Sequence, residues 1–175
     1  MGRLLDCLEE EGLEKNTLVI FTSDNGCSPQ ANFEVLKEHG HDPSGIYRGH
    51  KADIFEGGHR VPLIVKWPGH IQPGKVTRGL ACHTDVYATL EAIAGNSEEF
   101  AGGEDGFSLV PFFQGKEHSV RTGLVSHSID GSFAIREGDW KLCLCYGSGG
   151  WSAPKEKQAK TDGFPPLQLF NLSKD

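Results

Sequence analysis

The sequence has no long apolar run, no block of basic residues and no regular set of cysteines. No stretch approaches the roughly 20 apolar residues of a membrane helix, and residues 1–5 soon give way to acidic ones, which predicts neither a transmembrane segment nor a signal peptide. The formal net charge of −7 argues against nucleic acid and anionic membranes as partners. The 5 cysteines are an odd number without a CxxC pair, which argues against a disulfide framework and a zinc site.

Two segments carry apolar side chains at helical spacing. Residues 2–12 have leucines on one face and acidic residues near their end, and Gly12 follows as a stop signal. Residues 85–94 repeat this pattern, with Gly95 as the stop and Thr84 where an N-cap residue is expected. These patterns predict two amphipathic helices that pack on a sheet.

Two apolar runs are typical of strands. Residues 17–22 are apolar or β-branched at successive positions, which predicts a strand buried on both faces of a parallel sheet. Residues 61–67 form a similar run that ends at a Pro-Gly pair, and the early proline there restricts it to a strand start or an edge. The connection between them, residues 27–56, is expected to be a long loop that either has a functional role or is disordered.

The C-terminal part has shorter, alternating segments. Strands are expected at residues 122–127, 132–136, 140–146 and 167–172, and a tight hairpin is expected at residues 137–139. The fold class is therefore α/β, with helices on the faces of a sheet, followed by a small antiparallel β subdomain. We predict a division into residues 1–115, the α/β part, and residues 116–175, the antiparallel part.

The polar sequence SDNG, residues 23–26, follows the first predicted strand directly. In open α/β sheets, ligands bind in the crevice beyond the carboxyl ends of the strands. Asp24 and Asn25 stand at such a position and are candidates for chemistry. Because Asp-Asn-Gly is also ordinary turn chemistry, the motif by itself leaves both interpretations open.

The flanking residues carry a specific resemblance. The segments NTLVIFTSDNG at residues 16–26 and YRGHKADIFEGGHRVP at residues 47–62 resemble the C-terminal half of the formylglycine-dependent, arylsulfatase-like sulfatases. Shorter similar motifs continue to the end of the chain. The resemblance implies an alkaline-phosphatase-like α/β fold and the hydrolysis of sulfate esters, assisted by one Ca²⁺ ion.

The resemblance also implies roles for individual residues. Asp24 and Asn25 match two calcium ligands of the family, and Lys51 matches its sulfate-binding lysine, whose ammonium group steadies the ester oxygens. His59 and Arg60 are candidates to face the substrate, although a structural role is the favoured interpretation for both. Residues 56–58, Glu-Gly-Gly, are interpreted as the tight backbone that leads into the next strand.

The cysteines do not provide the nucleophile that the family requires. In the family, a Cys-x-Pro-x-Arg signature yields formylglycine, whereas Cys27 begins a similar sequence in which Ala31 replaces the arginine. We therefore interpret Cys27 as an ordinary cysteine, and Cys143 and Cys145 as core residues that share one face of a strand. The formylglycine and the first acidic calcium pair are expected in an N-terminal half that is missing here, so the chain resembles a fragment.

Three interpretations of function follow. The first is part of a sulfatase that acts on a sulfated glycan or an aryl sulfate, periplasmic or secreted by analogy with the family. The second is a binding module for sulfated glycans without turnover. The third is a phosphatase or phosphonate hydrolase of the same superfamily, against which an Asp-Asn pair with a nearby lysine argues, because such enzymes usually bind transition metals through more histidines.

Overall fold

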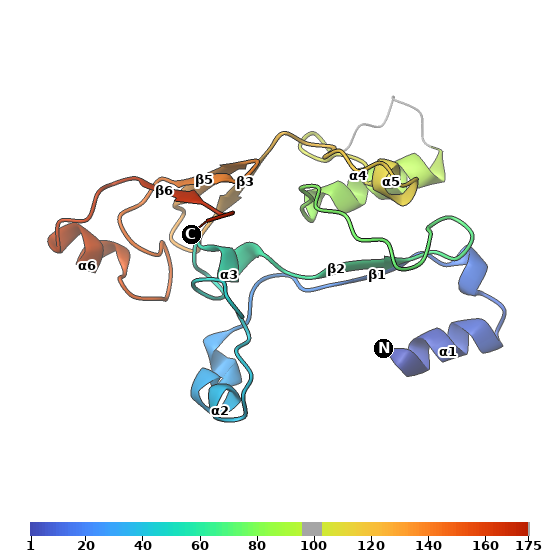
Figure 1. The fold of residues 1–175 in the computed structure, drawn as a ribbon, viewed down its shortest axis with the longest axis horizontal. Coiled ribbons are helices and arrows are strands. Elements are labelled where there is room, and N and C mark those ends of the chain that lie inside the picture. The colour runs from blue at the N-terminus through green and yellow to red at the C-terminus, as the bar shows by residue number, and fades with distance from the viewer. Residues whose placement is uncertain (96–102, 175) are drawn as a thin grey trace. The chain divides into compact units, whose positions relative to one another are not determined.

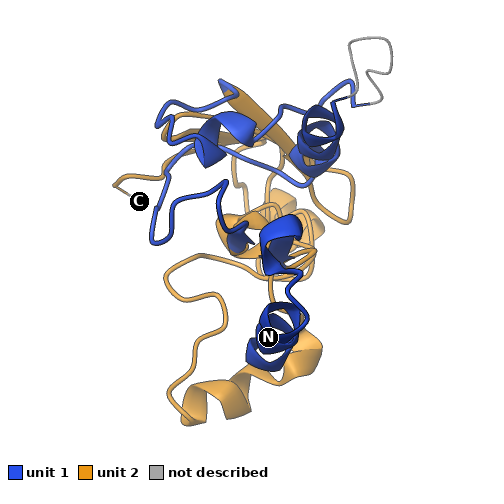
Figure 2. Cartoon of the chain, turned by 90° about the vertical axis from the view of Figure 1, so that its right-hand side faces the viewer, with its two compact units in different colours: residues 1–22, 63–122 blue, residues 23–62, 123–175 orange. Residues whose placement is uncertain are grey.

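The computed structural model describes residues 1–95 and 103–174 (Figure 1). The chain forms two compact units (Figure 2): unit 1 comprises Met1–Thr22 and Leu63–Thr122, and unit 2 comprises Ser23–Pro62 and Gly123–Asp175. The units do not follow the division at residue 115, which stays a prediction. No helix in the described ranges is both long and apolar enough to cross a membrane.

Unit 1 is built from short elements. They are α1 (Gly2–Glu10), η1 (Glu14–Asn16), β1 (Val19–Thr22), β2 (Leu63–Lys66), α4 (Thr84–Ala94) and α5 (Val110–Phe113). The two predicted helices are confirmed as α1 and α4. Helix α4 ends at Gly95, whose φ of 74° places it in the left-handed region that glycine favours. The expected cap at Thr84 is wrong, since the helix begins there and His83 precedes it without a capping bond from its side chain.

Strands β1 and β2 form a two-stranded antiparallel sheet, with Val19 opposite Lys66 and Thr22 opposite Leu63. The predicted parallel pairing and burial on both faces are therefore wrong for the residues that the structure describes. Phe21 is 43% exposed. A continuous apolar run indicates a strand, but it does not determine the direction or the number of the strand's neighbours.

Unit 2 combines a four-stranded sheet with short helices. The strands are β3 (Gly123–His127), β4 (Phe133–Glu137), β5 (Trp140–Cys143) and β6 (Gln168–Asn171), and the helices are η2 (Pro29–Ala31), α2 (Phe33–Glu38), α3 (Glu56–His59) and α6 (Glu156–Thr161). The sheet is antiparallel with the order β3-β4-β5-β6, which confirms the predicted subdomain. Residues 27–56 are not a plain loop, because η2 and α2 lie within them.

The hairpin between β4 and β5 is confirmed. Glu137 lies opposite Trp140, so two residues form the turn, and Gly138 adopts a φ of 55° there. The two faces of the sheet differ. One face contributes Ala134 and Cys143 to a core with Ile54, Phe55 and Cys145.

The opposite face exposes apolar side chains in one row across the strands. Val125 is paired with Ile135, Ile135 with Leu142 and Leu142 with Leu169. Val125 and Leu169 are 61% and 62% exposed. This row is an apolar patch on the sheet of unit 2.

Candidate functional site

The turn at residues 23–26 lies directly after β1. The Ser23 hydroxyl donates to the Asn25 carbonyl at 2.8 Å, and Nδ2 of Asn25 donates to the Gly26 carbonyl at 3.1 Å. Asp24 is exposed, and its carboxylate has no ion pair or hydrogen bond within the described ranges. The turn therefore presents one carboxylate and one side-chain amide oxygen that the protein itself does not use.

The turn packs closely against residues 56–58. The Gly26 N–H donates to the Gly58 carbonyl at 2.9 Å, and a Cβ added at Gly26 would lie 1.8 Å from the Gly57 carbonyl oxygen. A Cβ added at Gly57 would likewise lie 2.2 Å from the Gly49 carbonyl oxygen. Only glycine fits at these positions, and the tight backbone expected at residues 56–58 is present.

Lys51 lies beside the same turn. Its N–H donates to the carbonyl of Cys27 at 3.0 Å, so Lys51 is joined to the residue that follows Gly26. Its ammonium group makes no ion pair with any residue that the structure describes. Within unit 2, the fold thus brings the segment of Asp24 and Asn25 next to the segment of Lys51, although the two segments are more than 20 residues apart in the sequence.

His59 and Arg60 follow the two glycines and have different surroundings. Nε2 of His59 is buried and has no hydrogen-bond partner among the described residues. Burial lowers the pKa of His59, and the charge of Lys141 lowers this pKa further. The Arg60 guanidinium lies 4.7 Å from the centroid of the Tyr47 ring and 3.5 Å from the Glu56 carboxylate. Substrate contact by either residue stays a prediction.

Glu56 is a residue of this region whose role the sequence did not suggest. Its carboxylate lies 3.0 Å from Nζ of Lys141 and 3.4 Å from the Arg136 guanidinium. Burial opposes the ionisation of Glu56, but the charges of Lys141, Arg136 and Arg60 outweigh it and keep the pKa of Glu56 below its ordinary value. Glu56 therefore joins helix α3 to strands β4 and β5.

Asp53 is a second residue whose role the sequence did not suggest, and its side chain is fully buried. Its carboxylate accepts hydrogen bonds from the N–H groups of Trp151 and Ser152, at 2.8 and 2.9 Å. It also accepts from the His50 N–H at 2.9 Å and from the Ser152 hydroxyl. A single aspartate in a loop sequence carries no signal for partners 98 residues away.

The cysteines give no sign of a nucleophile. The thiol of Cys27 has only a weak contact, 3.8 Å to the Ser28 carbonyl. Cys143 and Cys145 are buried, as predicted, but the shared strand is wrong, because β5 ends at Cys143. Burial together with the neighbouring Cys143 raises the pKa of Cys145 to about 11. A buried thiol with so high a pKa is a poor nucleophile at neutral pH.

The donor set suits Ca²⁺ in kind but falls short in number. Asp24 and Asn25 supply two oxygen donors, and Ca²⁺ takes about 6–8. Within residues 1–95 and 103–174, no group of three or more histidine, cysteine, aspartate or glutamate side chains is placed to hold a metal ion. A complete site at Asp24 and Asn25 needs further oxygen donors.

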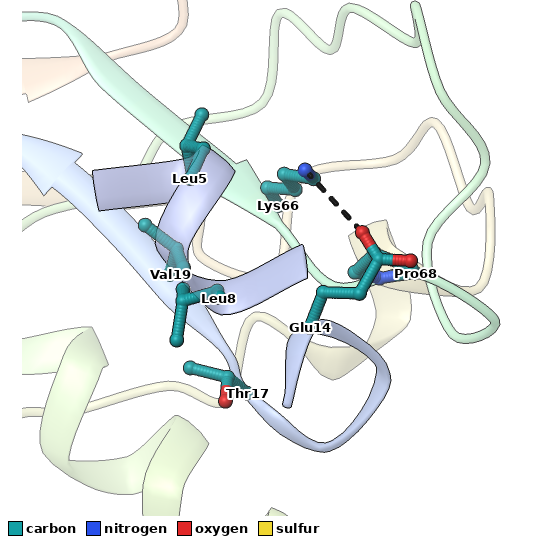
Figure 3. A pocket seen from close by; sticks show the side chains of 7 residues that line it. All are labelled: Leu5, Leu8, Glu14, Thr17, Val19, Lys66 and Pro68. Atoms are coloured by element: carbon teal, nitrogen blue, oxygen red, sulfur yellow. Dashed lines mark ion pairs between the residues drawn. The ribbon is translucent and has the colours of Figure 1, made fainter. Parts of the chain in front are cut away.

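Unit 1 contains a hollow that is separate from these residues (Figure 3). Its lining is mostly apolar but includes the ion pair between Lys66 and Glu14, at 3.9 Å. The lining residues are Leu5, Leu8, Glu14, Thr17, Val19, Lys66 and Pro68. None of the predicted site residues contributes to it, so we do not regard it as the candidate site.

Comparisons with known proteins show the family of this chain. The family model described as Sulfatase matches residues 1–96. The chain is 35% identical to the N-acetylgalactosamine-6-O-sulfatase of Bacteroides thetaiotaomicron and 36% identical to human arylsulfatase A. Both alignments cover the whole chain but only 34% and 35% of those proteins, so the chain spans about a third of the relatives' length.

Solved structures show the same similarity. A structure described in connection with the metabolism of multiple glycosaminoglycans by Bacteroides thetaiotaomicron matches 99% of this chain and 36% of its own, with a TM-score of 0.81 and 29% identity. A sulfatase from Pseudoalteromonas sp. matches 99% of this chain and 34% of its own, with a TM-score of 0.72 and 31% identity.

Proposed function

The chain belongs to the sulfatase family, and we propose that it supplies calcium ligands and the sulfate-binding lysine of an enzyme that hydrolyses sulfate esters. The observation that carries this proposal is the meeting of two motifs within unit 2. The hydrogen bonds from Gly26 to Gly58 and from Lys51 to Cys27 bring the Asp24 turn and the Lys51 loop together. A cation and an anion can then be bound side by side.

Lys51 is the residue of this chain that acts on the sulfate group. Its ammonium group pairs with a sulfate oxygen and stabilises the negative charge that develops on the leaving oxygen as the S–O bond breaks. Because no carboxylate among the described residues neutralises Lys51, its full charge is available to the ligand. A lysine already held in an ion pair would lose part of this effect.

Asp24 and Asn25 hold the metal ion in this proposal. When bound, Ca²⁺ draws electron density from the sulfate oxygens and makes sulfur more electrophilic. The two residues contribute hard oxygen donors, and the close packing of Gly26 fixes the turn that carries them. The remaining donors come from residues other than these two.

The proposal assigns the nucleophile to residues outside this sequence. No cysteine of the 175 residues begins a Cys-x-Pro-x-Arg signature, and Ala31 stands in the arginine position after Cys27. Formylglycine, when present in the enzyme, supplies the attacking hydroxyl group.

A sulfated glycan or an aryl sulfate is the proposed substrate, because the relatives' names include N-acetylgalactosamine-6-O-sulfatase and arylsulfatase A. A binding module for sulfated glycans without turnover is the second candidate, favoured by the lack of a nucleophile in the chain.

Binding of inorganic sulfate tests the role of Lys51. Titration of the chain with sodium sulfate, followed by NMR, should shift the signals of Lys51, and Lys51→Ala should weaken binding at least about tenfold, because charge-assisted hydrogen bonds are the strong ones. Lys37→Ala is the matched control, since Lys37 is an exposed lysine that lies 3.5 Å from Asp42. Equal affinities of Lys51→Ala and the unmodified chain would contradict the proposal.

Calcium binding tests the Asp24 turn. We expect calorimetry to show only weak binding of Ca²⁺ to this chain, because two ligands rarely hold the ion. Asp24→Ala should abolish even that binding, whereas Asp162→Ala, at the end of α6, should leave it unchanged. Micromolar affinity that is lost in Asp24→Ala would mean that the chain builds a complete site by itself.

A further inference from the structure

The turn that carries Lys51 has an unfavourable backbone. Ala52, the next residue, has a φ of 81°, in the left-handed region that residues with a Cβ rarely adopt. Such a conformation persists only where the surroundings hold it. The structure shows what holds it here.

Several distant segments bind this turn through backbone atoms. The carbonyl of Ala52 accepts from the Ile129 N–H at 3.0 Å, and the Ile54 N–H donates to the Ser148 carbonyl at 2.8 Å. Gly150 packs so closely that an added Cβ would lie 2.5 Å from the Ala52 carbonyl oxygen. The turn is thus packed against the loop at residues 148–152.

The carboxylate of Asp53 connects the two sides. Oδ1 accepts from the Trp151 and Ser152 N–H groups, and Oδ2 accepts from the His50 N–H and the Ser152 hydroxyl. One buried side chain therefore fixes the residue before Lys51 and the loop at residues 148–152 at once. Four donors on one carboxylate hold it more firmly than any single backbone bond does.

The side chain of Lys51 has no such support. No ion pair from a described residue fixes its ammonium group. Only backbone atoms of Lys51 are bonded: its N–H donates to the Cys27 carbonyl, and its own carbonyl lies 2.9 Å from Nδ1 of His50. The direction of the side chain then depends on the backbone of residues 50–53. The carboxylate of Asp53 binds both this backbone, at His50, and the loop at residues 148–152.

We propose that Asp53 is a positioning residue for Lys51: its buried carboxylate holds the turn at Ala52 against the loop at residues 148–152 and so directs the Lys51 ammonium group to the sulfate. This inference rests on the proposed sulfate-binding function of Lys51. Asp53 itself does not touch the sulfate.

Asp53→Asn is the direct test, because it keeps the shape of the side chain but turns one acceptor oxygen into an NH₂ group that faces N–H donors. The NMR signals of the Lys51 ε-methylene group in sulfate-free protein report its position independently of binding. In Asp53→Asn we expect these signals to move toward the values of an unstructured lysine, and the affinity for inorganic sulfate to fall about tenfold. Ser152→Ala removes one donor of the four, and we expect changes in the same direction, about two- to threefold in affinity.

Glu156→Gln is the matched control for stability alone. Glu156 is another carboxylate of unit 2 that accepts from two backbone N–H groups, those of Tyr146 and Gly147, both at 2.8 Å, but it has no hydrogen bond or ion pair with residues 50–54. We expect it to lower the melting temperature without changing the Lys51 signals or the sulfate affinity.

The outcomes separate the two proposals. Unchanged Lys51 signals in Asp53→Asn and in Ser152→Ala would overturn the positioning role, as would equal losses of sulfate affinity in Asp53→Asn and Glu156→Gln. If Asp53→Asn does not fold, Ser152→Ala decides in the same way. If Lys51→Ala binds sulfate as well as the unmodified chain, the proposed function fails. If Lys51→Ala loses sulfate affinity but Asp53→Asn and Ser152→Ala do not, only the positioning role is overturned.

Discussion

Each unit of the molecule contains a fully buried aspartate, but the two carboxylates are held in different ways. In unit 1, Asp85 binds the Arg121 guanidinium and accepts from the N–H groups of Cys82 and Phe107, at 2.8 and 2.9 Å. In unit 2, Asp53 accepts, among the described residues, from backbone N–H groups and the Ser152 hydroxyl, with Nδ1 of His50 at 3.5 Å. One is an ion pair, and the other is a carboxylate within a shell of N–H and O–H donors.

The comparison separates a role in stability from a role at the site. Asp85 joins helix α4 to the segments at Phe107 and Arg121, none of which contains a predicted site residue. Asp53 binds the turn that carries Lys51. Loss of the ion pair between Asp85 and Arg121 should therefore affect stability alone, whereas changes near Asp53 should affect both stability and ligand binding.

The largest expected loss in the free energy of unfolding is that of Arg121→Met. It leaves the Asp85 charge buried without its cationic partner, and removal of one partner of a buried ion pair costs about 3–5 kcal/mol. Urea unfolding, together with hydrogen exchange of the α4 amides, measures the loss. The double variant Asp85→Asn with Arg121→Met should recover part of it, and a loss below about 1 kcal/mol in the single variant would contradict this view of unit 1.

A smaller effect is expected of Glu56→Gln in unit 2. Lys141 is almost fully buried and would lose its anionic partner, while Arg136 and Arg60 would keep access to solvent. We expect a loss of about 2 kcal/mol in the free energy of unfolding, less than for Arg121→Met because Glu56 is less buried than Asp85. Asp42→Asn, which breaks the exposed pair with Lys37, should cost less than about 0.5 kcal/mol. Equal losses in both variants would contradict the role of Glu56.

The pH dependence of stability should come from the same region of unit 2. The pKa values of His59 and Glu56 are both lowered in the folded chain, so the unfolded chain takes up their protons first as the pH falls. Stability is therefore fully present above the ordinary values of 6.5 for His59 and 4.5 for Glu56, and it is lost as the pH falls through the lower folded values.

Thermal unfolding between pH 8 and pH 4 measures this effect. We expect the melting temperature to fall with acidification in two parts, the first below pH 6.5 and the second below pH 4.5. His59→Gln should remove the first part and Glu56→Gln the second. A melting temperature that rises on acidification would contradict the direction of both pKa shifts.

The smallest expected effect on stability is at the apolar row of the unit 2 sheet. Val125→Thr and Ile135→Thr change exposed side chains on the face opposite the core, so the free energy of unfolding should change by less than about 0.5 kcal/mol each. The double variant should reduce self-association, measured by sedimentation velocity, because it interrupts an exposed apolar patch. Ala134→Thr, on the buried face, is the contrasting variant and should destabilise the sheet. Similar stability losses on both faces would contradict the assignment of the core.

Much of the local structure could be predicted from the sequence, because its signals are local. The spacing of leucines gives α1, the glycine at position 95 ends α4, and alternation with a short turn gives the hairpin of β4 and β5. The pairing of β1 was predicted wrongly, since the direction of a neighbouring strand is not encoded in an apolar run. Likewise, α2 was missed because only six residues form it.

The candidate site divides in the same way. The residue types at Asp24, Asn25 and Lys51 could be identified within their motifs, and the glycines at residues 57 and 58 indicated a tight backbone. The roles of Asp53 and Glu56 could not be predicted, because their partners lie 98 and 85 residues away.

By itself, the sequence determined which residues carry charge, which can turn tightly and which segments form helices and strands. These properties depend on a side chain and its nearest neighbours along the chain. Only the tertiary structure decided that the Asp24 turn lies against residues 56–58, that Lys51 bonds to Cys27 and that Asp53 holds the loop at residues 148–152. A buried carboxylate is stable only where donors from distant segments meet it, and that meeting is a property of the folded chain.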